Sequence, residues 1–108
     1  MNGTLGALAE PNRLRIVELL RGGPRSVNEI VEKLDLPQPL VSKHLRVLRD
    51  VGLVRVLPHA QQRVYELQAK PFEDLDTWVS SFRRLWEDRL DSLDDYLQEM
   101  KKQKRRRE

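Results

Sequence analysis

Polar side chains between residues 38 and 46 recur at intervals that place them together on one side of a helix. They are Gln38, Ser42, Lys43 and Arg46. A glutamine amide can bond adenine twice, lysine and arginine favour guanine or phosphate, and serine can bond either. The apolar positions Val41, Leu45 and Leu48 must point the opposite way, toward a core. The exposed, mostly basic face predicts contact with the major groove of double-stranded DNA, against the alternative of an ordinary solvated helix face.

Two neighbours of these side chains are also candidate DNA contacts. Pro39 suits the first turn of a helix, where a missing N–H costs nothing, and it could touch a thymine methyl group. His44 falls on the shoulder of the helix, between Leu40 and Val47. It could reach a phosphate or be half-buried and hydrogen-bonded, and both interpretations stay open.

A third group of candidates lies between two alternating apolar runs, residues 53–57 and 63–67, which predict a β-hairpin. Arg63 could hold a phosphate or enter the minor groove, with Gln62 beside it, or both could belong to a solvated turn. The connecting residues 58–62 contain no glycine. We therefore expect a turn looser than type I′, which needs positive φ angles.

No arrangement of residues in the sequence suggests catalysis or a cofactor. The chain has no cysteine, and neither histidine has a serine or aspartate placed beside it in the sequence pattern. Glycine-rich phosphate loops are missing too. We expect neither an enzyme nor a metal site, and we expect thiol redox sensing to be excluded.

Several elements are predicted to position the candidate residues. A short helix over 4–9 precedes a second helix that begins at Pro11 and stops at the Gly22-Gly23-Pro24 segment. The residues Ser26 to Glu29 read as a capping box that opens a third helix. The fourth helix runs from Gln38 to Val51 and stops at Gly52. The expected fold class is mostly α with a small β-hairpin.

A single long helix is predicted from Pro71 to about Lys102, because apolar residues recur there every three or four positions without proline or glycine. Its stripe, together with the first helix, predicts a homodimer interface, since a body of ~70 residues cannot cover so much apolar surface. An aromatic ligand cavity is the alternative for the stripe. The expected interface residues are Leu5, Leu8, Val79, Phe82, Trp86, Leu90, Leu93 and Leu97.

Charge divides the 108 residues into three parts. Residues 1–70 carry a net charge of +4, residues 71–99 carry −6 and residues 100–108 carry +5, for a total of +3. We accordingly expect a DNA-binding domain over 1–70, a dimerisation helix over 71–102 and a basic disordered tail over 103–108. The start of the chain has no signal-peptide pattern and no segment is apolar enough to span a bilayer, so a cytoplasmic protein without membrane contact is expected.

Three helices followed by a hairpin is the order of a winged helix-turn-helix, in which the last helix of the turn enters the major groove. Two blocks then resemble the ArsR family of winged-helix repressors: residues 8–20 (LAEPNRLRIVELL) and residues 39–54 (PLVSKHLRVLRDVGLV). Residues 63–67 (RVYEL) are similar to the returning wing strand of the family, so the resemblance covers residues 5–67.

The resemblance implies a bacterial homodimeric repressor that binds an inverted-repeat operator and is released by some signal. The resemblance implies that some metal-sensing members of the family carry cysteine where this chain has Ser26. Others carry Asp/His and His/Glu pairs on the last helix, where this chain has no histidine. Residues 78–91 are similar to the metal-independent branch. An unknown small-molecule effector is compatible with this interpretation. The main alternative is a protein-interaction module whose long amphipathic helix docks a partner protein.

Overall fold

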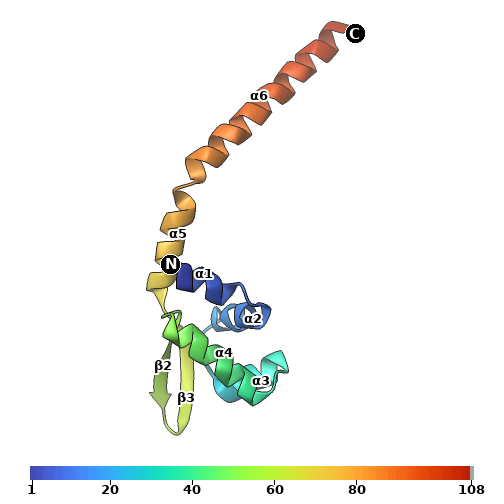
Figure 1. Cartoon of the computed structure of the whole chain (residues 1–108). Helices are drawn as coiled ribbons and strands as arrows, with labels where there is room; N and C mark the ends of the chain where they lie inside the picture. Colours follow the sequence, from blue (N-terminus) through green and yellow to red (C-terminus); the bar gives the residue numbers. More distant parts are fainter. Residues whose placement is uncertain (108) are drawn as a thin grey trace. The chain divides into compact units, whose positions relative to one another are not determined.

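The computed structural model describes residues 1–107 and divides the chain into two compact units, residues 1–74 and residues 75–108. The first unit contains the helices α1 (Asn2–Leu8), α2 (Pro11–Leu20), α3 (Val27–Leu34) and α4 (Gln38–Asp50), and the strands β1 (Arg25–Ser26), β2 (Val54–His59) and β3 (Gln62–Leu67) (Figure 1). Helix α5 (Ala69–Ser80) begins in the first unit and ends in the second, which also contains α6 (Arg83–Arg107).

The starts of α2 and α3 follow from local hydrogen bonding. Helix α2 begins after Glu10, whose carboxylate accepts a hydrogen bond from the Arg13 backbone N–H at 2.8 Å. Helix α3 begins with the predicted capping box: the Ser26 hydroxyl accepts from the Glu29 N–H, and the Ser26 N–H donates to the Glu29 carboxylate. It ends at Asp35, which takes the left-handed conformation with φ of 52°. These caps satisfy N–H groups that a helix start leaves unpaired.

The core of the first unit is formed by apolar residues from α2, α3, α4 and the start of β2. Its fully buried side chains are Ile16, Ile30, Val41, Leu45, Leu48, Leu53 and Val54. The apolar face predicted for residues 38–51 is therefore confirmed, and it fixes which face of α4 is left for solvent.

The three strands form an antiparallel sheet in the order β1-β3-β2. In the hairpin, His59 pairs with Gln62, so only Ala60 and Gln61 connect the strands. The expectation of a looser turn was wrong: Ala60 itself takes a φ of 57° and closes a two-residue loop without glycine. The two-residue strand β1, which pairs Arg25 with Tyr65, was not predicted.

The single helix predicted over 71–102 is instead two helices. Helix α5 ends at Ser80 and α6 begins at Arg83. The Ser81 hydroxyl donates a hydrogen bond to the Trp78 carbonyl oxygen at 2.6 Å, and the Phe82 N–H bonds the Val79 carbonyl in a three-residue step. Serine side chains can compete with the backbone for such carbonyls, and this bond accompanies the break.

The predicted disordered tail also differs from the structure. Residues 103–107 are the last residues of α6, and residue 108 lies outside the described residues.

Candidate nucleic-acid interface

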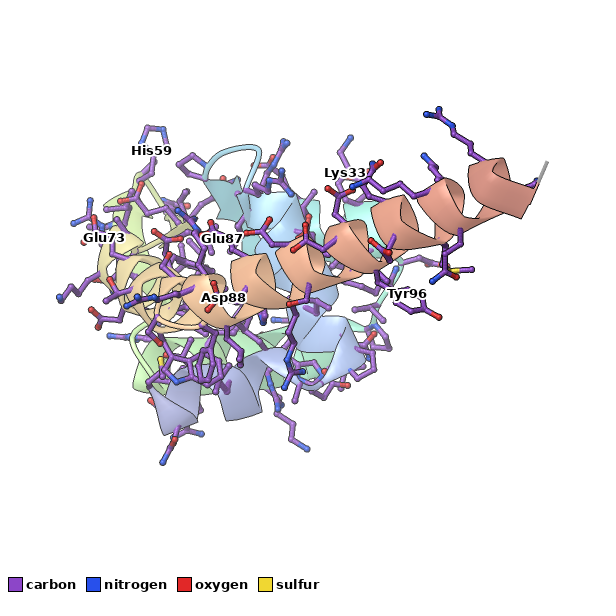
Figure 2. All side chains as sticks on the ribbon, turned by 90° about the horizontal axis from the view of Figure 1, so that it is seen from above. Lys33, His59, Glu73, Glu87, Asp88 and Tyr96 are labelled. Carbon is purple, nitrogen blue, oxygen red and sulfur yellow. The ribbon has the colours of Figure 1, made fainter. Side chains whose placement is uncertain are left out.

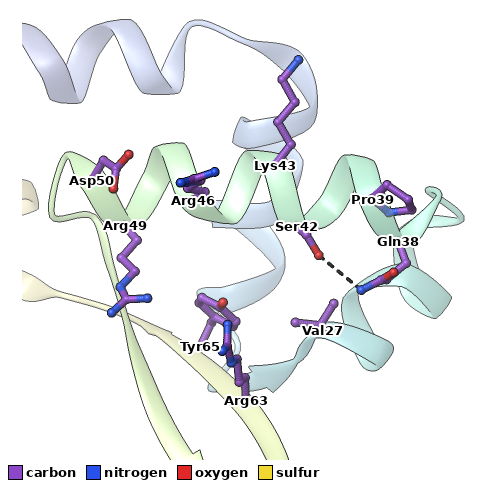
Figure 3. Close-up of a pocket in the computed structure, with 10 residues that line it drawn as sticks. All are labelled: Val27, Gln38, Pro39, Ser42, Lys43, Arg46, Arg49, Asp50, Arg63 and Tyr65. Carbon is purple, nitrogen blue, oxygen red and sulfur yellow. Dashed lines mark hydrogen bonds between the residues drawn. The ribbon is translucent and has the colours of Figure 1, made fainter.

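An open groove of about 710 Å³ lies between the exposed face of α4 and the inner side of the hairpin (Figure 3). Most of its lining comes from α4, with further side chains from α3 and β3. The lining residues are Val27, Gln38, Pro39, Ser42, Lys43, Arg46, Arg49, Asp50, Arg63 and Tyr65. Six of the eight predicted DNA-contact residues are thus brought together in one place.

Helix α4 presents these side chains because its opposite face is held in the core. Val41, Leu45 and Leu48 are fully buried, whereas Gln38, Ser42, Lys43 and Arg46 are exposed. The Gln38 amide donates a 3.4 Å hydrogen bond to the Ser42 hydroxyl (Figure 3). Lys43 points to the opposite side of α4 from Arg49. The groove therefore offers amide, hydroxyl and cationic donors from one rigid helix.

The electrostatics of the groove are dominated by cations. The lining contains four basic side chains, those of Lys43, Arg46, Arg49 and Arg63, and one carboxylate, that of Asp50. Within the described part of the chain, none of the four basic side chains forms an ion pair. Other arginines in the first unit do so, among them Arg55 with Glu66 on the hairpin. Positive charge that is not neutralised internally remains available to an anionic ligand.

Arg49 is a lining residue that the sequence analysis missed. It follows Ser42 by seven positions and Arg46 by three, so helical periodicity places it beside both of them. Its side chain extends toward the hairpin (Figure 3). The signal was present in the spacing, but Arg49 falls between the exposed face and the shoulder of the helix and could not be assigned to either.

A second, smaller hollow of about 310 Å³ adjoins the groove between the start of α3 and the hairpin tip. Gln62 and Arg63 line it together with Ser26, Val27, Asn28 and Gln61. The hydrogen bond from the Ser26 backbone N–H is the largest influence that lowers the pKa of the Glu29 carboxyl beside this hollow. The carboxylate is thus committed to the capping box.

Of the two interpretations left open for His44, the structure favours the buried one over contact with DNA. His44 is buried, with 6% of its surface exposed, and its Nε2 atom lies 3.7 Å from the Glu10 carboxylate. Its Nδ1 atom is also buried. At 100° per residue His44 lies about 40° beyond Leu48, at the edge of the buried face, and it turns inward.

The second unit carries a long apolar face that is exposed along α6. Every residue from 83 to 105 is exposed, including Trp86, Leu90, Leu93 and Leu97. Figure 2 labels Glu87, Asp88 and Tyr96 on this helix. Of the other predicted interface residues, Leu5 is 37% exposed and Phe82 packs edge-on against Trp78, whereas Leu8 packs partly against the core and Val79 is half-buried.

Residues 1–107 contain neither a membrane-spanning helix nor a cluster of metal-ligating side chains. No helix there is long and apolar enough to cross a membrane. No three His, Asp or Glu side chains in the same residues gather as a metal-ligand set.

A three-helix core, a basic exposed helix and a two-stranded wing define a winged helix-turn-helix protein. Residues 10–56 match the family model described as "Bacterial regulatory protein, arsR family". The chain is 40% identical over 76 residues to the HTH-type transcriptional regulator Rv2034 of Mycobacterium tuberculosis, covering 70% of this chain and 71% of that protein. It therefore belongs to the ArsR family.

Two further comparisons agree with this assignment. The HTH-type transcriptional repressor SmtB of M. tuberculosis is 44% identical over 63 residues, which are 58% of this chain but only 47% of that protein. The crystal structure of an ArsR family transcriptional regulator, RHA00566, superposes with a TM-score of 0.70 at 31% identity, over 80% of this chain and 89% of the other. These proteins are named as transcriptional regulators, not as enzymes.

Proposed function

We propose that this protein is a homodimeric transcriptional repressor that reads an inverted-repeat DNA operator through the major groove. The observation that carries the proposal is the exposed face of α4, where Gln38, Ser42, Lys43 and Arg46 stand opposite a fully buried apolar face. A rigid helix with amide and cationic donors on one side fits the donor and acceptor pattern of the major groove.

The wing is proposed to add contacts to the DNA backbone or the minor groove. Arg63 lines both the groove and the smaller hollow, and it makes no ion pair in the described part of the chain. An arginine in this position can hold a phosphate or enter a narrow minor groove. Gln62, next to it on the same strand, can donate to the same backbone.

The dimer is proposed to form through the apolar face of α6, with Leu5 of α1 contributing. An amphipathic helix whose apolar stripe faces water loses the free energy of burying that stripe. A second copy of the chain offers a matching stripe. Twofold symmetry would then present two recognition helices about one DNA turn apart, ~34 Å, so the operator would be an inverted repeat.

The first experiment is a selection of random DNA duplexes with the purified protein, followed by gel shifts on the enriched sequence. Lys43→Ala and Arg46→Ala should each weaken operator binding by about 1–3 kcal/mol, because each removes a direct donor. Lys33→Ala, which removes one charge from the surface of α3, is the matched control and should bind nearly as the parent chain does. Unchanged binding by the Lys43→Ala, Arg46→Ala double variant would refute the assignment of α4.

A second candidate function is favoured by the same exposed α6 face: docking of a different protein. Light scattering of the purified chain separates the two cases. A monomer that enriches no duplex supports the docking role, whereas a dimer that selects an inverted repeat supports the repressor.

Release by a small effector is tested by thermal shift with candidate ligands on the dimer.

A further inference from the structure

One residue, Gln68, bonds three consecutive carbonyl oxygens that directly follow the proposed recognition helix. Its side-chain Nε2 donates to the Gly52 oxygen at 3.1 Å and to the Val54 oxygen at 3.3 Å. Its backbone N–H donates to the Leu53 oxygen at 2.9 Å.

The position of Gln68 in the chain gives these bonds a directional role. Strand β3 ends at Leu67, which pairs with Val54, and α5 begins at Ala69. Gln68 is therefore the joint between the sheet and α5. The carbonyls that it bonds belong to Gly52 and Leu53, in the turn after α4, and to Val54, the first residue of β2. The residue before α5 is thus tied to the turn that joins α4 to β2.

The backbone that Gln68 bonds follows the C-terminal cap of α4. Gly52 has a φ of 81°, which glycine adopts freely, and the N–H groups of Gly52 and Leu53 donate to the carbonyl oxygens of Arg49 and Leu48. These bonds use the N–H groups of the turn, and Gln68 supplies donors to its carbonyl oxygens. Gln68 is half-buried, so its amide bonds are partly shielded from competing water. The sheet pairing between β2 and β3 closes the hairpin without it, so the amide adds orientation beyond closure of the sheet.

We propose that Gln68 is a positioning residue that fixes the direction in which α5 leaves the end of α4, and so the separation of the two recognition helices in a dimer. This inference rests on the proposed function. It assigns to Gln68 the preference for one spacing between operator half-sites, because α5 leads into the segment proposed to hold the second copy.

The test uses the full chain and the enriched inverted repeat, remade as duplexes with one or two base pairs added to or removed from the centre. The parent chain should bind the duplex with the best half-site spacing about tenfold more tightly than duplexes one or two base pairs longer or shorter. This preference is expected for two linked DNA-binding domains of fixed geometry. Gln68→Met keeps the length of the side chain but removes both donors. Gln68→Glu replaces the donating amide with a carboxylate that the carbonyls repel. Both should reduce the preference to about threefold or less.

Two further variants control the interpretation. Gln68→Lys supplies new donors on a flexible stem and should recover most of the spacing preference, while Glu18→Gln makes a comparable change at an exposed site on α2 and should leave it intact. Affinity ratios between duplexes cancel any uniform change in charge or folded fraction, and melting curves set a temperature at which all variants are folded.

The inference would be overturned if the Gln68→Met and Gln68→Glu variants both kept the parent's preference for one half-site spacing. It would also be overturned if every variant, the controls included, lost that preference equally. Melting temperatures alone would change for a merely structural residue, without any change in spacing. A parent chain that enriches no duplex would instead refute the proposed function, and this inference with it.

Discussion

Ala60 occupies a backbone conformation that alanine rarely adopts. With φ of 57° at the first position of a two-residue hairpin loop, its Cβ crowds the following peptide. The hairpin carries this strain at its tip, next to His59 and the wing residues that are proposed to contact DNA. The register of β2 and β3 is evidently strong enough to impose it.

Ala60→Gly should therefore stabilise the first unit. Relief of the left-handed strain outweighs the added flexibility of glycine in the unfolded chain, for a net gain of about 0.5–1 kcal/mol. Thermal unfolding followed by circular dichroism should show a rise of a few degrees. Gln61→Gly is the matched control, because Gln61 does not share the positive φ; an equal rise there would contradict the explanation.

At the residue scale, the sequence predicted a side chain well where its helical angle was unambiguous. Val41, Leu45 and Leu48 repeat at intervals of three and four and are buried as expected. His44 and Arg49 sit at the edges of the two faces, where 100° per residue allows either environment. Their placement depends on tertiary partners such as Glu10, which lies 34 positions earlier in the chain.

At the scale of the element, α3 is secured at its start by the reciprocal bonds between Ser26 and Glu29. Arg25 adds an ion pair, with its Nη1 3.5 Å from Glu29 Oε2. The Ser26 backbone N–H lowers the pKa of the Glu29 carboxyl in the folded chain. The ionised carboxylate therefore favours folding above its ordinary pKa of 4.5, and this contribution is lost as the pH falls through the lowered value.

Ser26→Ala should lower the stability of the first unit by about 1 kcal/mol near neutral pH, because α3 loses its cap. The stability of the parent chain should fall as the pH drops below 4.5, in part because the Glu29 carboxylate becomes protonated. Glu29→Gln should remove this part of the pH dependence. Chemical unfolding at pH 7 and at pH 4 measures both effects. Asn28→Ala, an exposed change beside the cap, is the control; if its pH profile matched that of Glu29→Gln, the capping box would not be the cause.

The elements with strong local signals could be predicted from the sequence, and those that depend on distant partners could not. Residues close together in the sequence determine the cap at Ser26, the start of α2 at Pro11 and the exposed face of α4. Strand β1 is only two residues long and exists because β3 lies beside it. The break between α5 and α6 falls at residues 81–82, in a segment whose apolar periodicity continues without interruption.

At the scale of the whole molecule, the two units differ in how fully they bury their apolar residues. The first has a closed core, whereas α6 exposes Leu90 by 64% and Leu93 by 53%. A 25-residue helix is about 37 Å long, and in water such a helix gains most of its stability by covering its apolar face. We expect the second unit to obtain this cover from another copy of the chain.

The Leu90→Asp, Leu93→Asp double variant should convert a dimer into monomers, because charge on the stripe cannot be buried without a partner. Sedimentation or light scattering over a range of concentrations measures the change, and operator affinity should fall together with the dimer. Ser92→Asp adds a carboxylate to the same helix off the stripe and should remain dimeric. A double variant that stays dimeric would remove α6 from the interface.

Both tryptophans of the chain, Trp78 and Trp86, belong to the second unit, and each is about half exposed, at 42% and 51%. The intrinsic tryptophan fluorescence of the protein therefore reports on the second unit and not on the core of the first unit. Indole emission shifts to shorter wavelengths when water leaves its surroundings. Dilution of an unlabelled sample should therefore shift the tryptophan emission to longer wavelengths as the dimer dissociates. The dependence of this shift on protein concentration gives the dissociation constant of the dimer.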